Sequence, residues 1–524
     1  ECLANLARME NVTTENKSRR YYYRVPYQDT KLATGSSVTC LNDDQPVSNF
    51  EYVPEQHKVS FTRGVNRPAP PDIITVCLAE RISDAPKLAA VHGFIQRLSQ
   101  GDETDGPILR MLSQQAPQLE GLAAGQSILC ESPTPQAVLT AVRRLKGSHL
   151  VIQGPPGTGK TTTAAQVIAA LIADGKTVAI TANSHAAINN LLTSAYKCSQ
   201  QTNTQVTTVV VKADEALPQG IKVIQSNELN PEQHRLAGGT TWLFCRPEQT
   251  RKWDYLFIDE ASQLSLADAV AAGSCAQNIV LLGDQMQLPQ PTEGVHPGDS
   301  GLSVLDYLMQ GHATVPANQG IFLGTTHRMH PEVCKHISEG VYEGRLMSAS
   351  ACAAQGLVLK ATADPVLRKH GVVYVPVPHE NCNQSSKEEV SRIKELFINL
   401  QQQSWTDRNG ETRPVTLDDI LVVAPYNAQV RALRYALGNG TRIGTVDKFQ
   451  GQEAAVVIVS MTTSDGNNLP RSLDFLFSKN RLNVAISRAK CLALLVASPG
   501  LKEIECKTVE EMALMSFYAR LMNN

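Results

Sequence analysis

Short apolar runs that alternate with helical segments dominate the chain from residue 129 onward. The runs at 149–152, 255–258 and 420–424 hold four or five almost wholly apolar residues, which is typical of buried strands in parallel sheets. Most of these runs lead into segments with the apolar spacing of a helix. The pattern starts again near residue 318. The sequence therefore predicts an α/β fold with two lobes, 129–317 and 318–524, each a mainly parallel sheet between helices.

The first 128 residues follow two other patterns. Short β-branched or aromatic segments separated by turn residues fill residues 1–84, which predicts a β-rich accessory module that resembles a barrel. Apolar residues at helical spacing then predict a helical stalk or linker over 85–128. The Arg- and Tyr-rich segment 19–24 has two interpretations, a surface that stacks on bases or an ordinary strand with charged ends, and we favour the strand. In the second lobe, the polar segment 405–413 predicts a loop.

A glycine-rich loop joins the first strand of the first lobe to the helix predicted over 162–173. It fits the pattern G-x-x-x-x-G-K-[ST], whose backbone N–H groups surround phosphate oxygens at a helix N-terminus. Lys160 would reach the β- and γ-phosphates, and Thr161 would offer its hydroxyl to Mg²⁺. The alternative is a chance match in a turn, which the flanking strand and helix disfavour. The residues expected to bind nucleotide here are Gly154, Pro155, Pro156, Gly157, Thr158, Gly159, Lys160, Thr161 and Thr162.

Paired acids end the strand at 255–258, about a hundred residues after the loop. Asp259 would hold Mg²⁺, and Glu260 would polarise the attacking water. The alternative role for Asp259 is a helix cap. Arg328 and Arg488 lie far away in sequence, and each read alone is a surface ion-pair residue. A two-lobed ATPase, however, needs cations that reach the transferring phosphoryl group, and the arginine fork suits phosphate oxygens.

Composition limits the other possibilities. The 524 residues hold 48 basic and 50 acidic side chains, a net charge of −2, so nucleic acid would bind in a local groove rather than on a basic coat. The twelve cysteines form no C-x-x-C pair, which favours reduced thiols in an intracellular, cytoplasmic protein over a metal cluster. No apolar run has transmembrane length, so we expect no membrane partner. The start at Glu1 leaves open a processed chain or a piece of a longer one.

The ordered motifs resemble those of the superfamily 1B helicases, in the group that contains the nonsense-mediated-decay RNA helicase and the Okazaki-fragment nuclease-helicase. The resemblance covers about residues 130–500 and implies two RecA-like lobes, with ATP and Mg²⁺ as cofactors. The motifs that carry it are residues 154–161, 259–262, 283–288, 328–331, 445–453 and 483–489.

This resemblance also implies roles for single residues. Gln136 would read adenine, Gln287 would couple the γ-phosphate to the nucleic-acid groove, and Glu453 would approach the ribose. Arg328 and Arg488 would be arginine fingers. The decay helicase has a Tyr where this chain has His327, whose imidazole can still stack on adenine. The residues expected to line a single-strand path across both lobes are Asn183, Ser184, Thr240, Pro425, Tyr426 and Thr445.

These features predict an ATP-dependent helicase or translocase on single-stranded DNA or RNA. The direction, 5′ to 3′, rests on the resemblance alone, and the process would be DNA repair, DNA replication or RNA processing. One alternative is the motor part of a nuclease-helicase, with a nuclease domain upstream or on a partner protein, because residues 1–120 lack the clustered acids and lysine of a nuclease centre. Another is a scaffold that binds ATP without moving, which an intact Glu260 argues against.

Overall fold

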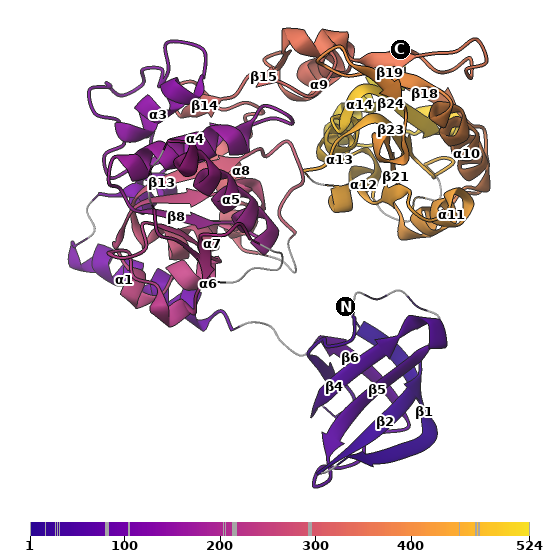
Figure 1. The fold of residues 1–524 in the computed structure, drawn as a ribbon, viewed down its shortest axis with the longest axis horizontal. Helices are drawn as coiled ribbons and strands as arrows, with labels where there is room; N and C mark the ends of the chain where they lie inside the picture. The colour runs from indigo at the N-terminus through magenta and orange to yellow at the C-terminus, as the bar shows by residue number, and fades with distance from the viewer. Residues whose placement is uncertain are drawn as a thin grey trace. The chain divides into compact units, whose positions relative to one another are not determined.

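Two compact units, Glu1–Ala85 and Pro86–Asn524, make up the chain (Figure 1). The computed structural model describes residues 2–15, 17–26, 28, 30, 32–43, 45–78, 83–102, 105–202, 204, 206–211, 217–291, 296–449, 451–466, 469 and 472–522. Gln450, inside one of the sequence motifs, lies outside the described residues. No described helix has both the length and the apolar character needed to cross a bilayer.

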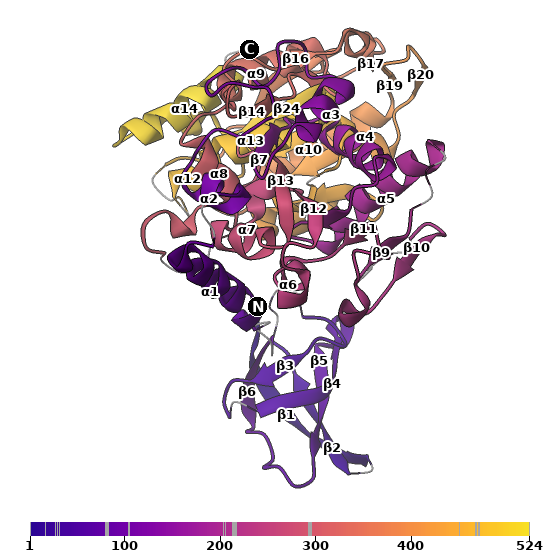
Figure 2. The same cartoon turned by 90° about the vertical axis from the view of Figure 1, so that its left-hand side faces the viewer.

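The first unit is a closed antiparallel barrel with strand order β1-β2-β5-β4-β3-β6, which confirms the barrel-like prediction (Figure 2). Alternate residues of β2 face the core: Tyr21 and Tyr23 are buried, and Tyr23 stacks on Phe61 with ring centres 5.5 Å apart. Two of the aromatic residues in segment 19–24 therefore serve the barrel core, as expected of an ordinary strand. The strands are β1 Cys2–Glu15, β2 Ser18–Arg24, β3 Val38–Cys40, β4 Gln45–Val53, β5 Lys58–Gly64 and β6 Ile73–Leu78.

Two helices, α1 Ala85–Gln100 and α2 Pro107–Leu112, follow the barrel. The prediction of a helical stalk over 85–128 was wrong beyond Leu112, because residues 113–128 form turns and irregular backbone. Gly121 and Gly125 there adopt positive φ, which is unfavourable inside a helix. α1 is fixed beside the first lobe by Lys87, whose Nζ lies 2.6 Å from Asp268.

The first large sheet has eight parallel strands in the order β10-β9-β11-β8-β12-β13-β7-β14. Its strands are almost wholly buried because helices cover both faces, with α3, α4 and α5 on one side and α7 and α8 on the other (Figure 1). The strands are β7 His149–Gln153, β8 Val178–Thr181, β9 Thr208–Val210, β10 Ile221–Val223, β11 Leu236–Gly238, β12 Trp253–Ile258, β13 Ala276–Gly283 and β14 Gly320–Phe322; the helices are α3 Pro135–Arg143, α4 Lys160–Ala173, α5 His185–Gln201, α6 Thr241–Phe244, α7 Leu266–Gly273 and α8 Val304–Met309.

The last strand of this sheet differs from the sequence prediction. β14 was expected to open the second lobe, but it pairs in parallel with β7, with Ile321 opposite Ile152. Pairing with a distant strand at a sheet edge is not encoded in the local pattern of β14, which is a short apolar run like many others. The first lobe therefore extends at least to Phe322.

The second large sheet has five parallel strands in the order β18-β24-β23-β21-β22, as the α/β prediction requires. Here too the strands are buried between helices. The strands are β18 Gly371–Pro376, β21 Ile420–Val423, β22 Arg442–Gly444, β23 Ala454–Ser460 and β24 Ala489–Ala497; the helices are α9 Pro331–Val341, α10 Lys387–Gln401, α11 Asn427–Leu437, α12 Leu473–Phe477, α13 Lys479–Ile486 and α14 Val509–Met522.

A small antiparallel sheet sits on the second lobe. It joins β17 Gly356–Val358, β19 Ser404–Thr406 and β20 Thr412–Pro414. The prediction of a polar loop over 405–413 was therefore wrong: it is a hairpin whose turn is built by Asp407, which accepts hydrogen bonds from the amides of Asn409 and Glu411. Turn residues at the tip and Thr on both strands gave a polar composition that concealed the strand pairing.

Candidate nucleotide site between the two lobes

The phosphate loop leaves the carboxyl end of β7 and enters α4. Gly157 and Gly159 both have φ of +76°, a left-handed conformation that glycine adopts without strain. Helix α4 begins at Lys160, so the amides of its first turn have no acceptor within the helix and carry its partial positive charge. This arrangement fits an anion such as a polyphosphate.

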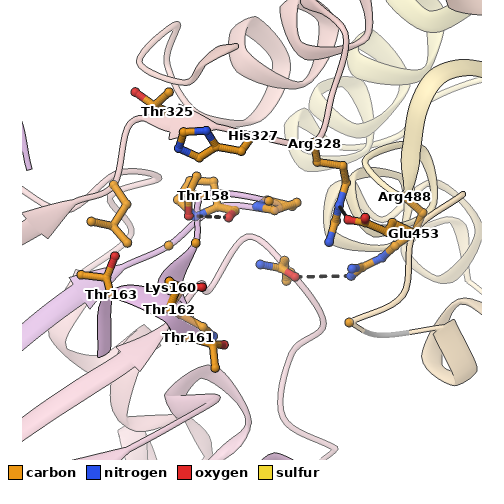
Figure 3. A pocket seen from close by; sticks show the side chains of 18 of the residues that line it. Thr158, Lys160, Thr161, Thr162, Thr163, Thr325, His327, Arg328, Glu453 and Arg488 are labelled. Carbon is orange, nitrogen blue, oxygen red and sulfur yellow. Dashed lines mark hydrogen bonds and ion pairs between the residues drawn. The ribbon is translucent and has the colours of Figure 1, made fainter. Parts of the chain in front are cut away.

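Residues that lead into the second lobe lie directly against the tip of this loop. Thr326 Oγ1 donates to the carbonyl of Pro156 at 2.8 Å, and the amide of His327 donates to the carbonyl of Gly157 at 2.8 Å. A Cβ on Gly157 would come within 2.5 Å of Arg328 Cβ. The loop and the segment 326–328 therefore form one packed unit, as the close-up of the pocket illustrates (Figure 3).

Lys160 and the two acids after β12 form a buried charge cluster. Lys160 Nζ lies 3.2 Å from Glu260 Oε1 and 3.3 Å from Asp259 Oδ1. Burial works against the charge on Lys160, but Glu260 and Asp259 outweigh it and raise its pKa. Burial also raises the pKa of Asp259, although Lys160 opposes it. A further cation beside Asp259 would therefore be favourable, and the carboxylate of Asp259 with the hydroxyl of Thr161 offers the hard oxygen ligands that Mg²⁺ takes alongside phosphates.

Two arginines from the second lobe lie close together across from the loop. Arg328 donates through Nε to Glu453 Oε2 at 2.8 Å and through Nη1 to the Ser487 carbonyl at 3.2 Å. Arg488 is 2% exposed and donates to Gln287 Oε1 at 3.4 Å (Figure 3). Burial and the charge of Arg328 lower the pKa of Arg488, and within the described part of the chain its Nε finds no acceptor. An anion between the arginines would relieve both costs.

One cavity of about 1330 Å³ joins these groups. Gln136 does not line this cavity, although residues 132–135 do. It is the second residue of α3, and its side chain is exposed. The predicted residues that line the cavity are Gly154, Pro155, Pro156, Gly157, Thr158, Gly159, Lys160, Thr161, Thr162, Asn183, Ser184, Asp259, Glu260, Gln287, His327, Arg328, Glu453 and Arg488.

Comparison with known proteins agrees with the geometry in pointing to an ATP-dependent protein with a nucleotide site. Two family models, each described as an AAA domain, match residues 135–362 and 301–499. The DNA replication ATP-dependent helicase/nuclease DNA2 of Gallus gallus is 27% identical over 427 residues, which are 76% of this chain and 40% of that protein. The dna2 helicase/nuclease of Schizosaccharomyces pombe is 26% identical over 69% of this chain and 27% of its own length. The DNA-binding protein SMUBP-2 of Rattus norvegicus is 25% identical over 65% of this chain and 40% of its own length.

The chain is therefore similar in sequence to helicases, in agreement with its resemblance to the superfamily 1B group. Its matched part runs through both lobes and contains the phosphate loop, the paired acids and both arginines. The chain spans less than half the length of the relatives named above.

A buried hydrogen-bond network ties the two lobes together behind the candidate nucleotide site. Asp284, 1% exposed at the end of β13, accepts from Tyr342 Oη at 2.6 Å and from Gln287 Nε2 at 2.8 Å. Asn483 of α13 donates to Tyr342 Oη at 2.8 Å and to the carbonyl of Met286 at 2.8 Å. Burial raises the pKa of Asp284, and these donors counteract the rise. Asp284 thus fixes the side chain of Gln287, which contacts Arg488.

The residues predicted to line a nucleic-acid path lie at the carboxyl ends of sheet strands. Asn183 and Ser184 follow β8, and Thr240 follows the neighbouring strand β11. Ser184 also caps α5, since its Oγ accepts from the Ala187 amide at 3.2 Å. In the second lobe the same edge holds the half-buried Pro425 and Thr445 and the buried Tyr426, which packs on Phe475. The structure therefore groups these residues on one edge of each sheet.

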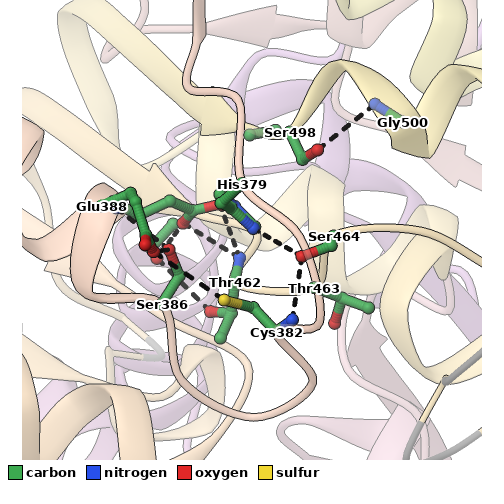
Figure 4. Close-up of polar contacts among 12 residues, drawn as sticks. His379, Cys382, Ser386, Glu388, Thr462, Thr463, Ser464, Ser498 and Gly500 are labelled. Carbon is green, nitrogen blue, oxygen red and sulfur yellow. Dashed lines mark hydrogen bonds and ion pairs between the residues drawn. The ribbon is translucent and has the colours of Figure 1, made fainter.

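A buried polar network stabilises that edge of the second sheet (Figure 4). His379 pairs through Nδ1 with Ser464 Oγ at 2.7 Å and through Nε2 with Glu389 Oε1 at 3.1 Å. The order resembles a serine–histidine–acid triad, but the side chains of His379 and Glu389 are fully buried and Ser464 is 3% exposed. Glu389 also accepts from the amide of Thr462, which has φ of +72°. The network holds the loops after β18 and β23 and leaves no access for a substrate.

Several residues of the site escaped the sequence analysis. Thr326 lies two positions before the motif that begins at Arg328, and this position was the signal in the sequence that could have identified it as a site residue. Asn483 lies inside a motif that carried the resemblance, yet its contact with the first lobe depends on tertiary packing. Tyr342 lies in a segment without any motif, and nothing in the sequence distinguishes it from a core residue.

Proposed function

We propose that this chain is an ATP-dependent helicase that moves along single-stranded nucleic acid. The observation that carries the proposal is the single cavity in which a phosphate loop, Lys160 and Glu260 of the first lobe meet Arg328 and Arg488 of the second. Charge that develops on a transferring phosphoryl group would be stabilised from both sides only while the lobes are together. Nucleotide state and lobe arrangement are then linked.

Each group has a distinct task in ATP hydrolysis. The loop amides and Lys160 would bind the β- and γ-phosphates, and Glu260 would accept a proton from the attacking water. Thr161 and Asp259 would hold Mg²⁺, which supplies positive charge at the phosphates. Lys160 and Glu260 are 3.2 Å apart, so a bound phosphate that attracts Lys160 would release the Glu260 carboxylate for the water.

Movement along a strand would follow from the coupling between the lobes. Gln287 contacts Arg488 and is fixed by Asp284. Loss of the γ-phosphate would therefore change the contacts of the first lobe, through Gln287, and of the second lobe, through Arg488. The strand-end residues of each sheet lie on the edge where open α/β sheets bind ligands. Alternate tightening of the two edges on a nucleic-acid backbone would advance it in short steps. Such a motor works inside the cell, where its ATP is.

DNA is the track that the relatives favour. Two of those relatives are DNA replication helicase/nucleases and the third is a DNA-binding protein. We therefore propose single-stranded DNA as substrate and 5′ to 3′ as direction. The test is unwinding of a labelled duplex that carries either a 5′ or a 3′ single-stranded tail, with ATP and Mg²⁺. The proposal expects the 5′-tailed duplex to be separated and the 3′-tailed one to stay paired; the opposite preference would refute the direction, and no unwinding of either would refute the helicase activity.

A further inference from the structure

The hairpin of β19 and β20 is firmly attached to the second lobe. Trp405 is 4% exposed and packs in the core of that lobe, opposite Leu357 of β17. Arg413 binds Asp419 through two nitrogens at 2.6 and 2.7 Å and lies over the Trp405 ring at 5.2 Å. A two-point ion pair and a buried indole restrict the hairpin to one position.

The tip of this hairpin lines the nucleotide cavity. Asp407, Arg408, Asn409 and Glu411 all contribute to its wall. Arg408 Nη1 donates to the carbonyl of His327 at 3.2 Å. The amide of the same His327 donates to the phosphate loop. Two consecutive hydrogen bonds thus connect the hairpin tip to the loop.

We propose that the hairpin tip forms one wall of the nucleoside half of the nucleotide site, with Arg408 as a residue that binds the base. This inference rests on the proposed function, because it locates the binding site of the nucleoside, the part of a bound nucleotide that the phosphate-binding groups do not contact. A guanidinium is planar and cationic, so it can stack on an aromatic base and donate hydrogen bonds at its edge. Since Arg408 is attached to the backbone of His327, the imidazole and the guanidinium belong to the same end of the cavity.

The charges at the tip favour a nucleoside over a phosphate. Asp407 and Glu411 bring two carboxylates into the wall beside Arg408. The backbone amide of Glu411, and next that of Asn409, hold the pKa of Asp407 below its usual range, although burial opposes them, so this carboxylate is charged at neutral pH. Carboxylates repel phosphates but accept hydrogen bonds from ribose hydroxyls and from base N–H groups.

The test compares the binding of ADP with that of inorganic pyrophosphate, which has the same two phosphates but no nucleoside. Dissociation constants would be measured by calorimetry with Mg²⁺ for the wild-type chain, Arg408→Ala and Arg408→Lys. Arg431→Ala serves as control, because this exposed arginine lies on α11 of the same lobe and does not line the cavity. ATP hydrolysis is measured separately, so that failure of the proposed function is seen on its own.

Arg408→Ala is expected to weaken ADP roughly fivefold to tenfold, the size of one cation–π or charged hydrogen-bond contact, and to leave pyrophosphate within twofold. Arg408→Lys keeps the positive charge but lacks the planar guanidinium, so it should recover only part of the lost affinity for ADP. The proposal is overturned by unchanged ADP binding in Arg408→Ala. It is also overturned by equal weakening of ADP and pyrophosphate, which would mean that Arg408 acts through the phosphate loop.

Discussion

Removal of the Tyr342 hydroxyl tests the link between the lobes. Tyr342→Phe deletes the 2.6 Å hydrogen bond to the buried carboxylate of Asp284 and leaves Asn483 without one acceptor. A hydrogen bond to a charged group contributes about 1.5–3 kcal/mol. Loss of this donor would raise the pKa of Asp284 further, because burial already raises it and the Tyr342 hydroxyl counteracts that rise.

The sign of the pH dependence follows from that shift. Burial raises the pKa of Asp284 in the folded chain, so the folded state binds its proton more tightly than the unfolded state and loses stability as pH rises. Tyr342→Phe enlarges this effect. Its cost is therefore complete above the raised folded pKa and shrinks as pH falls through it, since a protonated Asp284 no longer needs the donor.

The assay is urea unfolding of the wild type and Tyr342→Phe at pH 8 and at pH 5, followed by tryptophan fluorescence. Asp284→Asn provides the control background, because the amide is neutral at both pH values. We expect Tyr342→Phe to lower the unfolding free energy by about 1.5–3 kcal/mol at pH 8 and by less at pH 5. In the Asp284→Asn background the loss caused by Tyr342→Phe should be the same at both pH values. Equal losses at both pH values, or the same pH dependence in the Asp284→Asn background, would refute the role of Asp284.

Three further predictions concern other parts of the chain. Glu260→Gln should still bind ATP but hydrolyse it at least about a hundredfold more slowly in a steady-state assay, and unchanged turnover would mean that another group is the base. Gly157→Ala and Gly159→Ala should both strain a backbone with φ of +76°, but the added methyl meets neighbouring atoms only at Gly157. Thermal unfolding should therefore show Gly157→Ala to be less stable than Gly159→Ala by about 1–3 kcal/mol. Equal stabilities of the two variants would contradict the contact between the phosphate loop and the segment 326–328. In the barrel, Asp43→Asn leaves the buried Arg63 without its carboxylate, so urea unfolding of the barrel should show a loss of about 3–5 kcal/mol, whereas an unchanged curve would make the ion pair irrelevant.

Local features made most of the fold predictable. A parallel strand buried on both faces is a continuous apolar run, so β7, β12 and β21 were visible in the sequence. The phosphate loop was visible because all its groups lie within eight residues. The β-branched and aromatic residues of the first segments likewise predicted a barrel-like module, and the strand favoured for segment 19–24 is β2.

Features that depend on distant pairing were not predictable. β14 joins the first sheet through β7, more than 160 residues away, and its own sequence carries no sign of that partner. In the hairpin at Ser404–Pro414, β19 pairs with β20 and also with β17, which lies more than 40 residues earlier in the chain. Tyr342 acts through Asp284 and Asn483, and their meeting requires both lobes to be folded. Gln136 was assigned by resemblance, and the register of α3 leaves it exposed.

The hydrolysis of ATP with and without single-stranded DNA tests the central claim most directly. In this account the two lobes share one ATP site and the strand-end residues of both sheets hold the nucleic acid. The wild-type chain should therefore hydrolyse ATP with Mg²⁺ slowly by itself and much faster with single-stranded DNA, and Arg488→Ala should lose the stimulated rate. Hydrolysis that ignores added DNA, or a stimulated rate that survives the loss of Arg488, would contradict the account.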